Sequence, residues 1–436
     1  HVRRRLPETP SAPKFDTALP VGYQALMHSS LRASTRFLPG LALLTALLVT
    51  VVPAQAGDWP RWRGANFDGI SAENDWLKQW PADGLKTIWK GNVGIGYASM
   101  SVAEGRLYTM GNTDEVDSVV CLDAATGKEI WKHTYPCSSK DPNGFPGPRV
   151  TPTVDEGRVF TLSRNGHFFC LDARTGKPIW SKDFAKDYGA KVPTWGFSGS
   201  PLVEGQVVLT EVGGAGQAVV AFNKADGTEV WKAGDDAAAY SSIIPFDHQG
   251  QRTLAVLSAA GIEGRKAGDG AELWRYPWKT SYDVNAATPI VADGKVFISS
   301  GYNKGCALVD FASGTATKVW ESKKMRNHVA TCILWKGHLF GFDEGDLRCL
   351  ELATGAEKWA TEEYGKGSIL MAGDKFIVYS DQGRVAVLEP SVEKHQELAG
   401  YQALGGKNTW AAPVLANGRL YCRSMQDLVC LDVRAK

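Results

Sequence analysis

A ten-residue segment recurs along this chain and constrains its fold more than any other feature. The three best copies are Leu122–Trp131 (LDAATGKEIW), Leu171–Trp180 (LDARTGKPIW) and Phe222–Trp231 (FNKADGTEVW). Weaker copies begin at residues 265, 311 and 350, and two eroded copies begin at 388 and 431. The eight copies are spaced 38 to 51 residues apart, which is the length of a four-stranded propeller blade. We therefore predict an all-β fold, an eight-bladed β-propeller of four-stranded antiparallel blades.

The best-formed unit, residues 151–181, indicates how one copy forms a meander. Two short apolar runs flank the turn Asp155–Gly157, and Asn165-Gly166 then supplies the positive φ of a tight hairpin. In the recurring turn, the Asp can accept backbone N–H groups and the Gly can adopt a left-handed conformation. One meander cannot bury both of its faces, so the blades must stack, and a ring leaves no exposed end to the stack.

The last copy ends before its Trp strand, whereas a lone strand precedes the first full unit. The sequence Ile88-Trp89-Lys90 in this strand matches Ile130-Trp131-Lys132. We expect the N-terminal strand to complete the eighth blade and close the ring, so that residues 85–436 form a single propeller and residues 57–84 form an N-terminal docking segment. The Trp residues that repeat with the frame are expected to be structural. They are Trp89, Trp131, Trp180, Trp231, Trp274, Trp320 and Trp359.

The N-terminal region has the pattern of a targeting segment. Residues 38–52 form an apolar run that follows Arg32 and Arg36 and precedes Ala54-Gln55-Ala56. This pattern predicts a signal peptide over residues 27–56, cleaved after Ala56, and hence a periplasmic or secreted protein without a membrane span in its mature chain. An uncleaved anchor is the alternative, but the run is shorter than the ~20 residues that a spanning helix needs. Residues 1–26 look like an upstream extension.

Charge and cysteine content narrow the choice of partners. The formal net charge is +1, and without residues 1–56 it is −3, so we expect no nucleic-acid partner. Four of the eight Cys residues precede a Leu at equivalent repeat positions, as Cys121 and Cys170 do, which indicates core packing. If any pair is bridged, Cys422 and Cys430 are the most plausible, because a short hairpin joins them.

The recurring L-D-A-x-T-G-K-x-x-W element resembles the Trp-docked repeat of the pyrroloquinoline quinone (PQQ) propeller superfamily. The opening sequence at residues 58–69, DWPRWRGANFDG, is similar to the start of bacterial PQQ-like propeller proteins. The resemblance covers residues 58–434. It implies the propeller fold and two kinds of function, because the superfamily includes quinoprotein alcohol dehydrogenases and the non-enzymatic outer-membrane assembly factor BamB.

The segments that enter the first strand of each blade are expected to meet at one end of the ring, close to its axis. Small residues recur at these positions, so the residues that differ are candidates for a ligand-binding funnel. They are Tyr97, Arg149, Trp195, Tyr240, Asn285, Asn327, His328, Lys366 and Trp410.

Each of these residue types has a structural alternative. Trp195 and Trp410 either cap loops or stack on a planar ligand. Arg149 and Lys366 either form salt bridges or neutralise an anion. His328 either packs through a hydrogen bond or serves as a base or metal ligand.

Three further residues bear on metal binding and catalysis. Asn285 and Asn327 are either turn residues or amide ligands of a hard cation. Asp283 is the carboxylate nearest this rim in sequence and is the candidate catalytic base if the protein is an enzyme.

Two functions remain open, and we expect the non-enzymatic one. In it, the protein is a monomeric, BamB-like scaffold that holds envelope protein partners or a small anionic or planar ligand and needs no cofactor. The alternative is a small PQQ- and Ca²⁺-dependent oxidoreductase acting on alcohols. The chain lacks the adjacent Cys pair of the quinoprotein dehydrogenases and a C-x-x-C-H haem motif. It also lacks a lipid-anchoring Cys before Cys121, a departure from BamB that puts membrane attachment in doubt.

Overall fold

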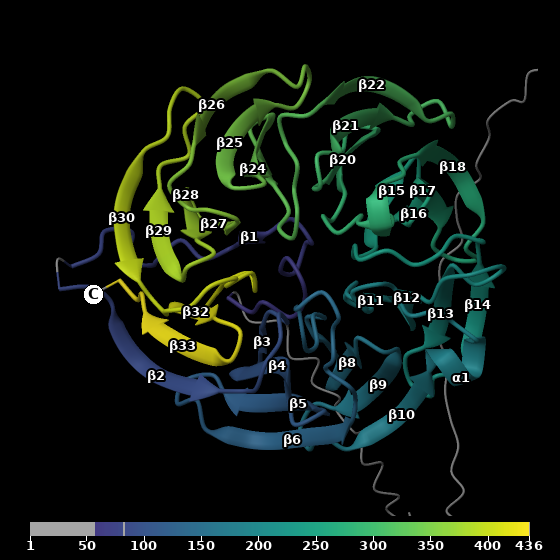
Figure 1. The fold of residues 1–436 in the computed structure, drawn as a ribbon, viewed down its shortest axis with the longest axis horizontal. Coiled ribbons are helices and arrows are strands. Elements are labelled where there is room, and N and C mark those ends of the chain that lie inside the picture. Colours follow the sequence, from purple (N-terminus) through teal and green to yellow (C-terminus); the bar gives the residue numbers. More distant parts are fainter. Residues whose placement is uncertain (1–56, 82, 436) are drawn as a thin grey trace, which may run out of the picture. The chain divides into compact units, whose positions relative to one another are not determined.

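Eight β-sheets surround a common centre in the computed structural model, which describes residues 57–81 and 83–435 (Figure 1). Each sheet is a consecutive antiparallel meander of four strands, and one sheet gains a fifth strand. The predicted eight-bladed propeller is confirmed. The predicted upstream extension and the predicted signal peptide lie outside the described residues.

We number the blades in chain order. Blade 1 contains β3 (Ser101–Ala103), β4 (Arg106–Thr113), β5 (Val116–Asp123) and β6 (Glu129–Pro136), and blade 2 contains β7 (Thr153–Asp155), β8 (Arg158–Leu162), β9 (His167–Asp172) and β10 (Pro178–Asp183). Blade 3 contains β11 (Leu202–Glu204), β12 (Val207–Glu211), β13 (Val219–Asn223) and β14 (Glu229–Ala233), and blade 4 contains β15 (Ile244–His248), β16 (Gln251–Leu257), β17 (Gly261–Lys266) and β18 (Glu272–Pro277).

The second half of the ring repeats this order. Blade 5 contains β19 (Ile290–Ala292), β20 (Lys295–Ser300), β21 (Gly305–Asp310) and β22 (Thr317–Ser322), and blade 6 contains β23 (Ile333–Trp335), β24 (His338–Asp343), β25 (Asp346–Glu351) and β26 (Glu357–Thr361). Blade 7 contains β27 (Ser368–Ala372), β28 (Lys375–Tyr379), β29 (Arg384–Leu388) and β30 (Glu397–Gln402), with β1 (Ile70–Ser71) parallel to β27 as the fifth strand. The helices of the described residues are one turn of α-helix, α1 (Phe184–Tyr188), and a 3₁₀ turn, η1 (Ser281–Asp283), and neither could span a membrane.

Blade 8 joins the two ends of the propeller. It contains β31 (Val414–Ala416), β32 (Arg419–Arg423), β33 (Asp427–Asp432) and the N-terminal strand β2 (Lys86–Asn92). Strand β2 pairs antiparallel with β33 and places Trp89 opposite Cys430, and the C-terminus lies beside it in Figure 1. The predicted closing strand is therefore present.

The recurring turn meets two requirements with one glycine. The Asp123 carboxylate accepts the N–H (2.8 Å) and the hydroxyl (2.7 Å) of Thr126, and the hydroxyl bond lowers the pKa of Asp123. Gly127 has a φ of +71°, and a Cβ atom on it would lie 2.6 Å from the indole of Trp89. The glycine is thus needed both for the turn and for the Trp that packs on it from the neighbouring blade.

Most repeat Trp residues dock in the same way, with the indole N–H donating to a carbonyl of the next blade. Trp131 bonds Ala173 O at 2.9 Å and Trp180 bonds Lys224 O at 3.1 Å. Trp274 differs, because its buried indole N–H has no partner among the described residues and its ring stacks on Phe311 at 4.5 Å. The other bonds are Trp89 to Ala124, Trp231 to Ala267, Trp320 to Leu352 and Trp359 to Ser391.

This difference predicts unequal effects of the same substitution. Trp180→Phe removes an indole hydrogen bond to a buried carbonyl, whereas Trp274→Phe removes none. We expect Trp180→Phe to destabilise the protein by about 1 kcal/mol more than Trp274→Phe, since the loss of apolar area is similar. Denaturant unfolding of the two variants checks this, and equal losses would contradict the docking role of the N–H.

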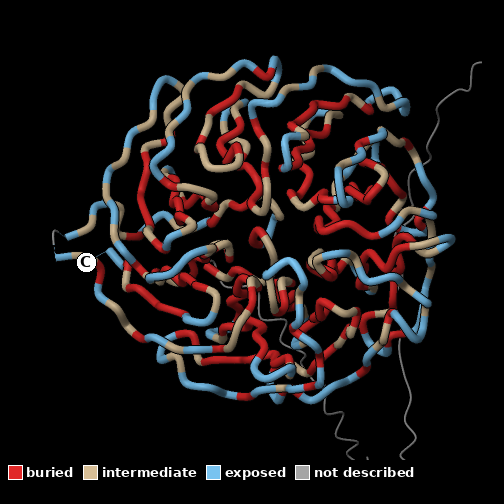
Figure 2. Tube along the Cα trace, in the orientation of Figure 1, coloured by how far each residue is buried: buried red, intermediate tan, exposed pale blue. Residues whose placement is uncertain are grey.

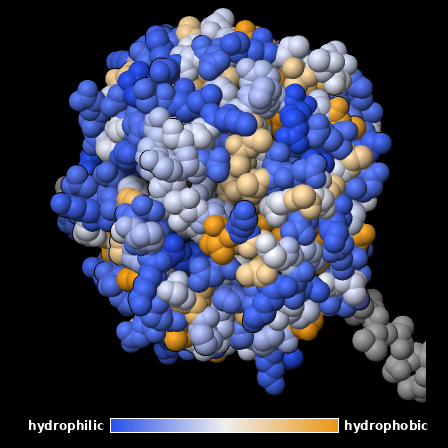
Figure 3. Space-filling model, turned by 45° about the vertical axis from the view of Figure 1, so that its right-hand side comes forward, coloured by the Kyte–Doolittle hydropathy of each residue, from blue (hydrophilic) through white to orange (hydrophobic). Residues whose placement is uncertain are grey.

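A β-bulge protects the outer edge of the blades. Between β5 and β6 the register shifts so that Trp131 lies opposite Cys121 and Glu129 opposite Leu122, which leaves Ile130 as the extra residue. Ile130 is 43% exposed, and inner strands are more buried than outer ones throughout the ring (Figure 2). Bulges of this kind make an edge strand a poor template for pairing with another chain. Figure 3 shows hydrophobic side chains only in small groups on a mostly hydrophilic face.

All eight cysteines are buried free thiols, so the disulfide considered for Cys422 and Cys430 is wrong. Cys430 lies opposite Tyr421 in the β32–β33 ladder, and Cys422 lies opposite Val429. Because side chains alternate between the faces of a sheet, the two thiols point to opposite faces.

Candidate functional site

The N-terminal docking segment crosses the centre of the ring. Trp59 exchanges backbone hydrogen bonds of 2.7 and 2.8 Å with Val102 in blade 1. Three residues later, the indole N–H of Trp62 donates to the Thr288 hydroxyl at 2.9 Å, just before blade 5. Blades 1 and 5 are opposite each other in a ring of eight, so this short stretch spans the central channel.

Arg63 fixes the path of the segment beyond the channel. Its Nη2 donates to Cys332 O, just before blade 6, at 2.9 Å and to Asp68 O at 2.7 Å, and its Nε donates to Phe67 O at 3.0 Å. Burial lowers the pKa of Arg63 to about 10, with Asp68 opposing that effect, so the side chain stays cationic at neutral pH. The segment continues into β1 on blade 7.

The segment enters from one end of the ring. The Asp58 carboxylate accepts the N–H of Glu104, in the turn between the first and second strands of blade 1. In a propeller these turns lie at the end opposite to the connections that join successive blades. The channel is therefore closed from the turn end and open as a funnel at the connection end.

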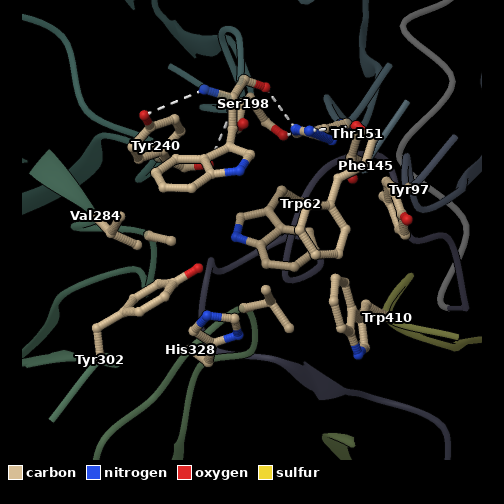
Figure 4. A pocket seen from close by; sticks show the side chains of 16 residues that line it. Trp62, Tyr97, Phe145, Thr151, Ser198, Tyr240, Val284, Tyr302, His328 and Trp410 are labelled. Atoms are coloured by element: carbon tan, nitrogen blue, oxygen red, sulfur yellow. Dashed lines mark hydrogen bonds between the residues drawn. The ribbon is translucent and has the colours of Figure 1, made fainter. Parts of the chain in front are cut away.

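A cavity of about 160 Å³ occupies this funnel, with Trp62 among its lining side chains (Figure 4). The structure brings six of the nine predicted funnel residues to its wall. They are Tyr97, Arg149, Trp195, Tyr240, His328 and Trp410.

Six side chains with rings line the cavity, and each ring contacts the next one around the wall. We call these six side chains the aromatic belt. The rings of Tyr97 and Trp410 stack at 5.5 Å, and those of Trp195 and Tyr302 stack at 6.2 Å, each with an interplanar angle of 26°. His328 joins these two pairs, with its ring 6.2 Å from Trp410 and 4.7 Å from Tyr302. The sixth ring is Tyr240, 5.9 Å from Trp195.

Arg149 is the charged residue of the cavity wall, and it is held rigidly. Its Nε donates to Trp195 O at 2.8 Å, and its Nη2 donates to Phe145 O at 2.6 Å and to the Asp141 carboxylate at 3.0 Å. Asp141 also pairs with Arg164 at 2.9 Å, so one buried carboxylate balances two guanidinium groups. The cluster carries one net positive charge beside the cavity. Burial lowers the pKa of Arg149, and Asp141 opposes that effect.

The surroundings of His328 favour its neutral form. Burial lowers its pKa, the positive charge of Lys366 adds to this effect and Glu344 opposes it. Its Nδ1 is buried without a hydrogen-bond partner in the described part of the chain. Lys366 itself lies outside the cavity wall, where its Nζ pairs with Glu344 at 2.9 Å.

The structure also places the funnel candidates Asn285 and Asn327 and the candidate base Asp283 away from the cavity. The Asn285 amide donates to Ser258 O and Trp278 O at 2.8 and 3.1 Å and accepts from a Ser hydroxyl. The Asn327 amide donates to Phe342 O at 2.8 Å. Both amides therefore form hydrogen bonds within the propeller itself. Asp283 is exposed in η1 and does not line the cavity.

Three aromatic residues of the wall were not among the predicted funnel residues. They are Trp62, Phe145 and Tyr302. Trp62 belongs to the segment that we expected only to dock, and Tyr302 lies between the second and third strands of blade 5, in a class of loop that the repeat comparison did not include. Phe145 precedes Arg149 in the long connection between blades 1 and 2, where an aromatic residue among Pro and Gly was the available signal.

A buried carboxylate holds the loop that carries Tyr240. Glu211, at the end of β12, accepts the Ala239 N–H at 2.9 Å, and its other oxygen has no partner among the described residues. Burial raises the pKa of Glu211 to about 8, and the charges of Glu263 and Asp236 add to the increase.

Stability should therefore depend on the ionisation of Glu211. Its pKa is about 8 when folded and 4.5 as the reference value, so the folded state binds the proton more tightly. The stabilisation is complete below pH 4.5 and is lost as the pH rises towards 8. We expect the free energy of unfolding to fall by about 2–3 kcal/mol between about pH 6 and about pH 9 from this group.

Denaturant unfolding across this pH range measures the effect. Glu211→Gln keeps an acceptor for the Ala239 N–H but cannot ionise, so it should remove this part of the pH dependence. The same slope in Glu211→Gln and the parent protein would contradict the assignment.

A sequence-family profile described as outer membrane protein assembly factor BamB matches residues 116–361, which is more than half of the chain. The chain belongs to this BamB family. No match was found among curated protein sequences. In this member of the BamB family, the region that matches the profile runs from β5 in blade 1 to β26 in blade 6.

Solved structures share the fold at low sequence identity. BamB from Moraxella catarrhalis is 16% identical with a TM-score of 0.58, over 81% of this chain and 98% of that one. A europium-containing methanol dehydrogenase is 13% identical with a TM-score of 0.64, over 84% and 89% of the two chains. A quinohemoprotein alcohol dehydrogenase from Pseudomonas putida HK5 is 16% identical with a TM-score of 0.63, over 87% and 81%.

The cavity wall of this BamB-family chain does not fit PQQ and Ca²⁺. Ca²⁺ takes about six to eight oxygen ligands, and the wall has no Asp, Glu, Asn or Gln side chain. In residues 57–81 and 83–435, no three His, Cys, Asp or Glu side chains are grouped to hold a metal. PQQ is a tricyclic anion with three carboxylates, whereas the wall offers the single cation Arg149.

Proposed function

We propose that this BamB-family protein is a non-enzymatic scaffold of the cell envelope, and that the funnel end of its ring binds a protein partner. The predicted signal peptide ending at Ala56 supports export, and the family's description as an outer membrane assembly factor supports a scaffold. We expect the scaffold to act as a monomer with no nucleic-acid partner.

The observation that carries the proposal is an exposed apolar rim at the mouth of the funnel. Tyr282 and Tyr302 are 68% and 45% exposed. The rings of Tyr282 and Tyr302 lie 6.0 and 6.2 Å from Trp195, so the rim continues into the aromatic belt. Exposed aromatic side chains around a concave centre are typical of protein interfaces.

The backbone at this rim is also unusual. Tyr282 and Tyr302 have φ values of +60° and +51°, a region that bulky residues rarely adopt. At Tyr302 the tight turn between β20 and β21 imposes this conformation, with the next residue, Asn303, also at a positive φ. We infer that the two tyrosines are held outward for contact with a partner.

The alternative function, a PQQ- and Ca²⁺-dependent alcohol oxidoreductase with Asp283 as the base, has less support. The wall lacks carboxylate and amide side chains that could ligate the metal, and Asp283 lies outside the wall. The solved quinoprotein dehydrogenases are similar to this chain in fold alone.

Site-specific photo-cross-linking in the envelope of producing cells tests the scaffold function. A photoreactive residue at Tyr282 or Tyr302 should give one discrete cross-linked protein. The matched control is Gln249, an exposed residue in the turn between β15 and β16 at the opposite end of the ring. Cross-linking at Gln249 but not at the rim, or at neither position, would contradict the proposal.

A further inference from the structure

The funnel has the size, charge and wall chemistry of a small-molecule site. We propose that it binds a small carboxylic acid that carries a single aromatic ring. This inference goes beyond the scaffold function and does not depend on it.

The volume of the funnel cavity suits a ligand with a single ring. A dry cavity of about 150 Å³ is known to hold benzene, and the funnel cavity measures about 160 Å³. A six-membered ring with a short carboxylate substituent therefore fits this space.

The aromatic wall favours a flat, apolar ligand. Trp195 and Tyr302 stack on one side of the cavity, and Tyr97 and Trp410 stack on another. In Figure 4 the Trp62 ring lies between Tyr302 and Trp410. A ligand ring between these side chains can make offset-stacked or edge-to-face contacts with several of them.

The charge of the wall favours an anion over a cation. Aromatic cages often bind cations, but here Arg149 is part of the cavity wall. Asp141 is shared between Arg149 and Arg164, so the cluster keeps a net positive charge. The Nη1 atom of Arg149 makes no hydrogen bond within the described residues, while its Nε and Nη2 are occupied. Nη1 is thus available to a carboxylate.

Hydroxyl groups complete a polar side of the cavity near Arg149. Ser200 Oγ accepts the Thr151 N–H at 3.2 Å, and Ser242 Oγ accepts the Ser200 N–H at 3.0 Å. Each of these hydroxyls keeps its own hydrogen to donate. In Figure 4, Ser198 and Thr151 lie across Trp62 from Tyr302 and His328, and the rings of Tyr240 and Phe145 lie on the same side as the two hydroxyl residues. A ligand whose carboxylate meets Arg149 and nearby hydroxyls would therefore still have its ring among aromatic side chains.

Calorimetric titration of the purified chain from Gly57 with phenylacetate tests the proposal. Two matched ligands separate the contributions: 2-phenylethanol has the ring without the charge, and cyclohexylacetate has the charge without the aromatic ring. We expect saturable binding of phenylacetate with one site per chain, at least about tenfold tighter than that of 2-phenylethanol, because a charge-assisted hydrogen bond is lost in the alcohol. Cyclohexylacetate should bind about threefold to tenfold more weakly than phenylacetate.

Variants locate the site. Trp195→Leu should weaken phenylacetate binding about threefold to tenfold, while Trp80→Leu, a partly buried Trp outside the cavity, should leave it unchanged. Arg149→Lys should reduce the preference for the acid over the alcohol. Circular dichroism and thermal unfolding of each variant verify that it is folded.

Three outcomes would overturn the proposal: no saturable binding of phenylacetate at millimolar concentration, equal affinity for all three ligands, or equal loss in Trp195→Leu and Trp80→Leu. None of these outcomes would affect the cross-linking test of the scaffold function, because that test reports on protein contact at the outer rim.

Discussion

Replacing Arg423 by methionine should lower the free energy of unfolding by about 3–5 kcal/mol. Arg423 is fully buried at the end of β32 in blade 8 and donates across the ring closure to blade 1 and the segment before it. Its Nη1 bonds Ala98 O, Thr109 Oγ1 and Met110 O at 2.6 to 2.8 Å, and its Nη2 bonds Gly94 O at 3.3 Å. Methionine fills a similar volume but leaves these acceptors without their donor.

The charge of Arg423 reduces this effect without reversing it. Burial lowers its pKa to about 9, so the folded state holds the cation at a cost, and methionine removes that cost. Several buried acceptors lose their bonds at once, which outweighs the gain. Guanidinium unfolding compares Arg423→Met with Arg434→Met, an exposed Arg paired with Asp432 near the same sheet. A loss in Arg423→Met no larger than that in Arg434→Met would contradict the role of Arg423 in closing the ring.

Trp89→Ala should cost about 3–5 kcal/mol, as much as the same change at Trp131. Trp89 lies on the closing strand β2, is 8% exposed, packs on Gly127 and donates to Ala124 O at 3.1 Å. Trp131 is also 8% exposed and makes the equivalent bond inside the continuous chain. Equal costs are expected because the two interfaces have the same construction.

The comparison of the two Trp variants tests closure directly. If β2 were a frayed terminal strand, Trp89→Ala would change the free energy of unfolding by less than about 0.5 kcal/mol, while Trp131→Ala would still cost several. Denaturant unfolding followed by far-UV circular dichroism measures both variants without relying on the fluorescence of the substituted Trp.

The fold was predictable because the same repeat residues are needed for the local turn and for the packing between blades. Gly127 is needed for the turn and for the contact with Trp89, and Asp123 organises the turn by accepting from Thr126. Residues that are needed for both purposes recur at the same position of the repeat, and for this reason eight copies could be counted in the sequence. Strand β1 was not predictable. Its two residues pair with β27, about 300 residues further along the chain, through backbone hydrogen bonds that require no particular side chain.

The site was predictable only where its residues depart from the repeat. Trp195, Trp410 and His328 stand out among small residues and do line the cavity. Asn285 and Asn327 stand out equally, but their amides bond backbone carbonyls, and only the folded structure separates the two cases.

Other parts of the site arise from chain geometry. Trp62 reaches the cavity because the segment that carries it crosses from blade 1 to blade 5, a path with no local signature. For Cys422 and Cys430, the sequence carried a signal that the folded structure does not support. Proximity along the hairpin suggested a disulfide, whereas the register places Cys422 and Cys430 on opposite faces.

We propose that this funnel is a binding site and that it lacks the donor set for a quinone cofactor and its metal. Titration of the chain from Gly57 with PQQ in the presence of Ca²⁺, followed by an assay of dye reduction with short alcohols, tests it most directly. We predict no saturable heat of PQQ binding and no dye reduction above that of PQQ alone. Stoichiometric binding of PQQ together with alcohol-dependent dye reduction would contradict the claim and make the protein an oxidoreductase.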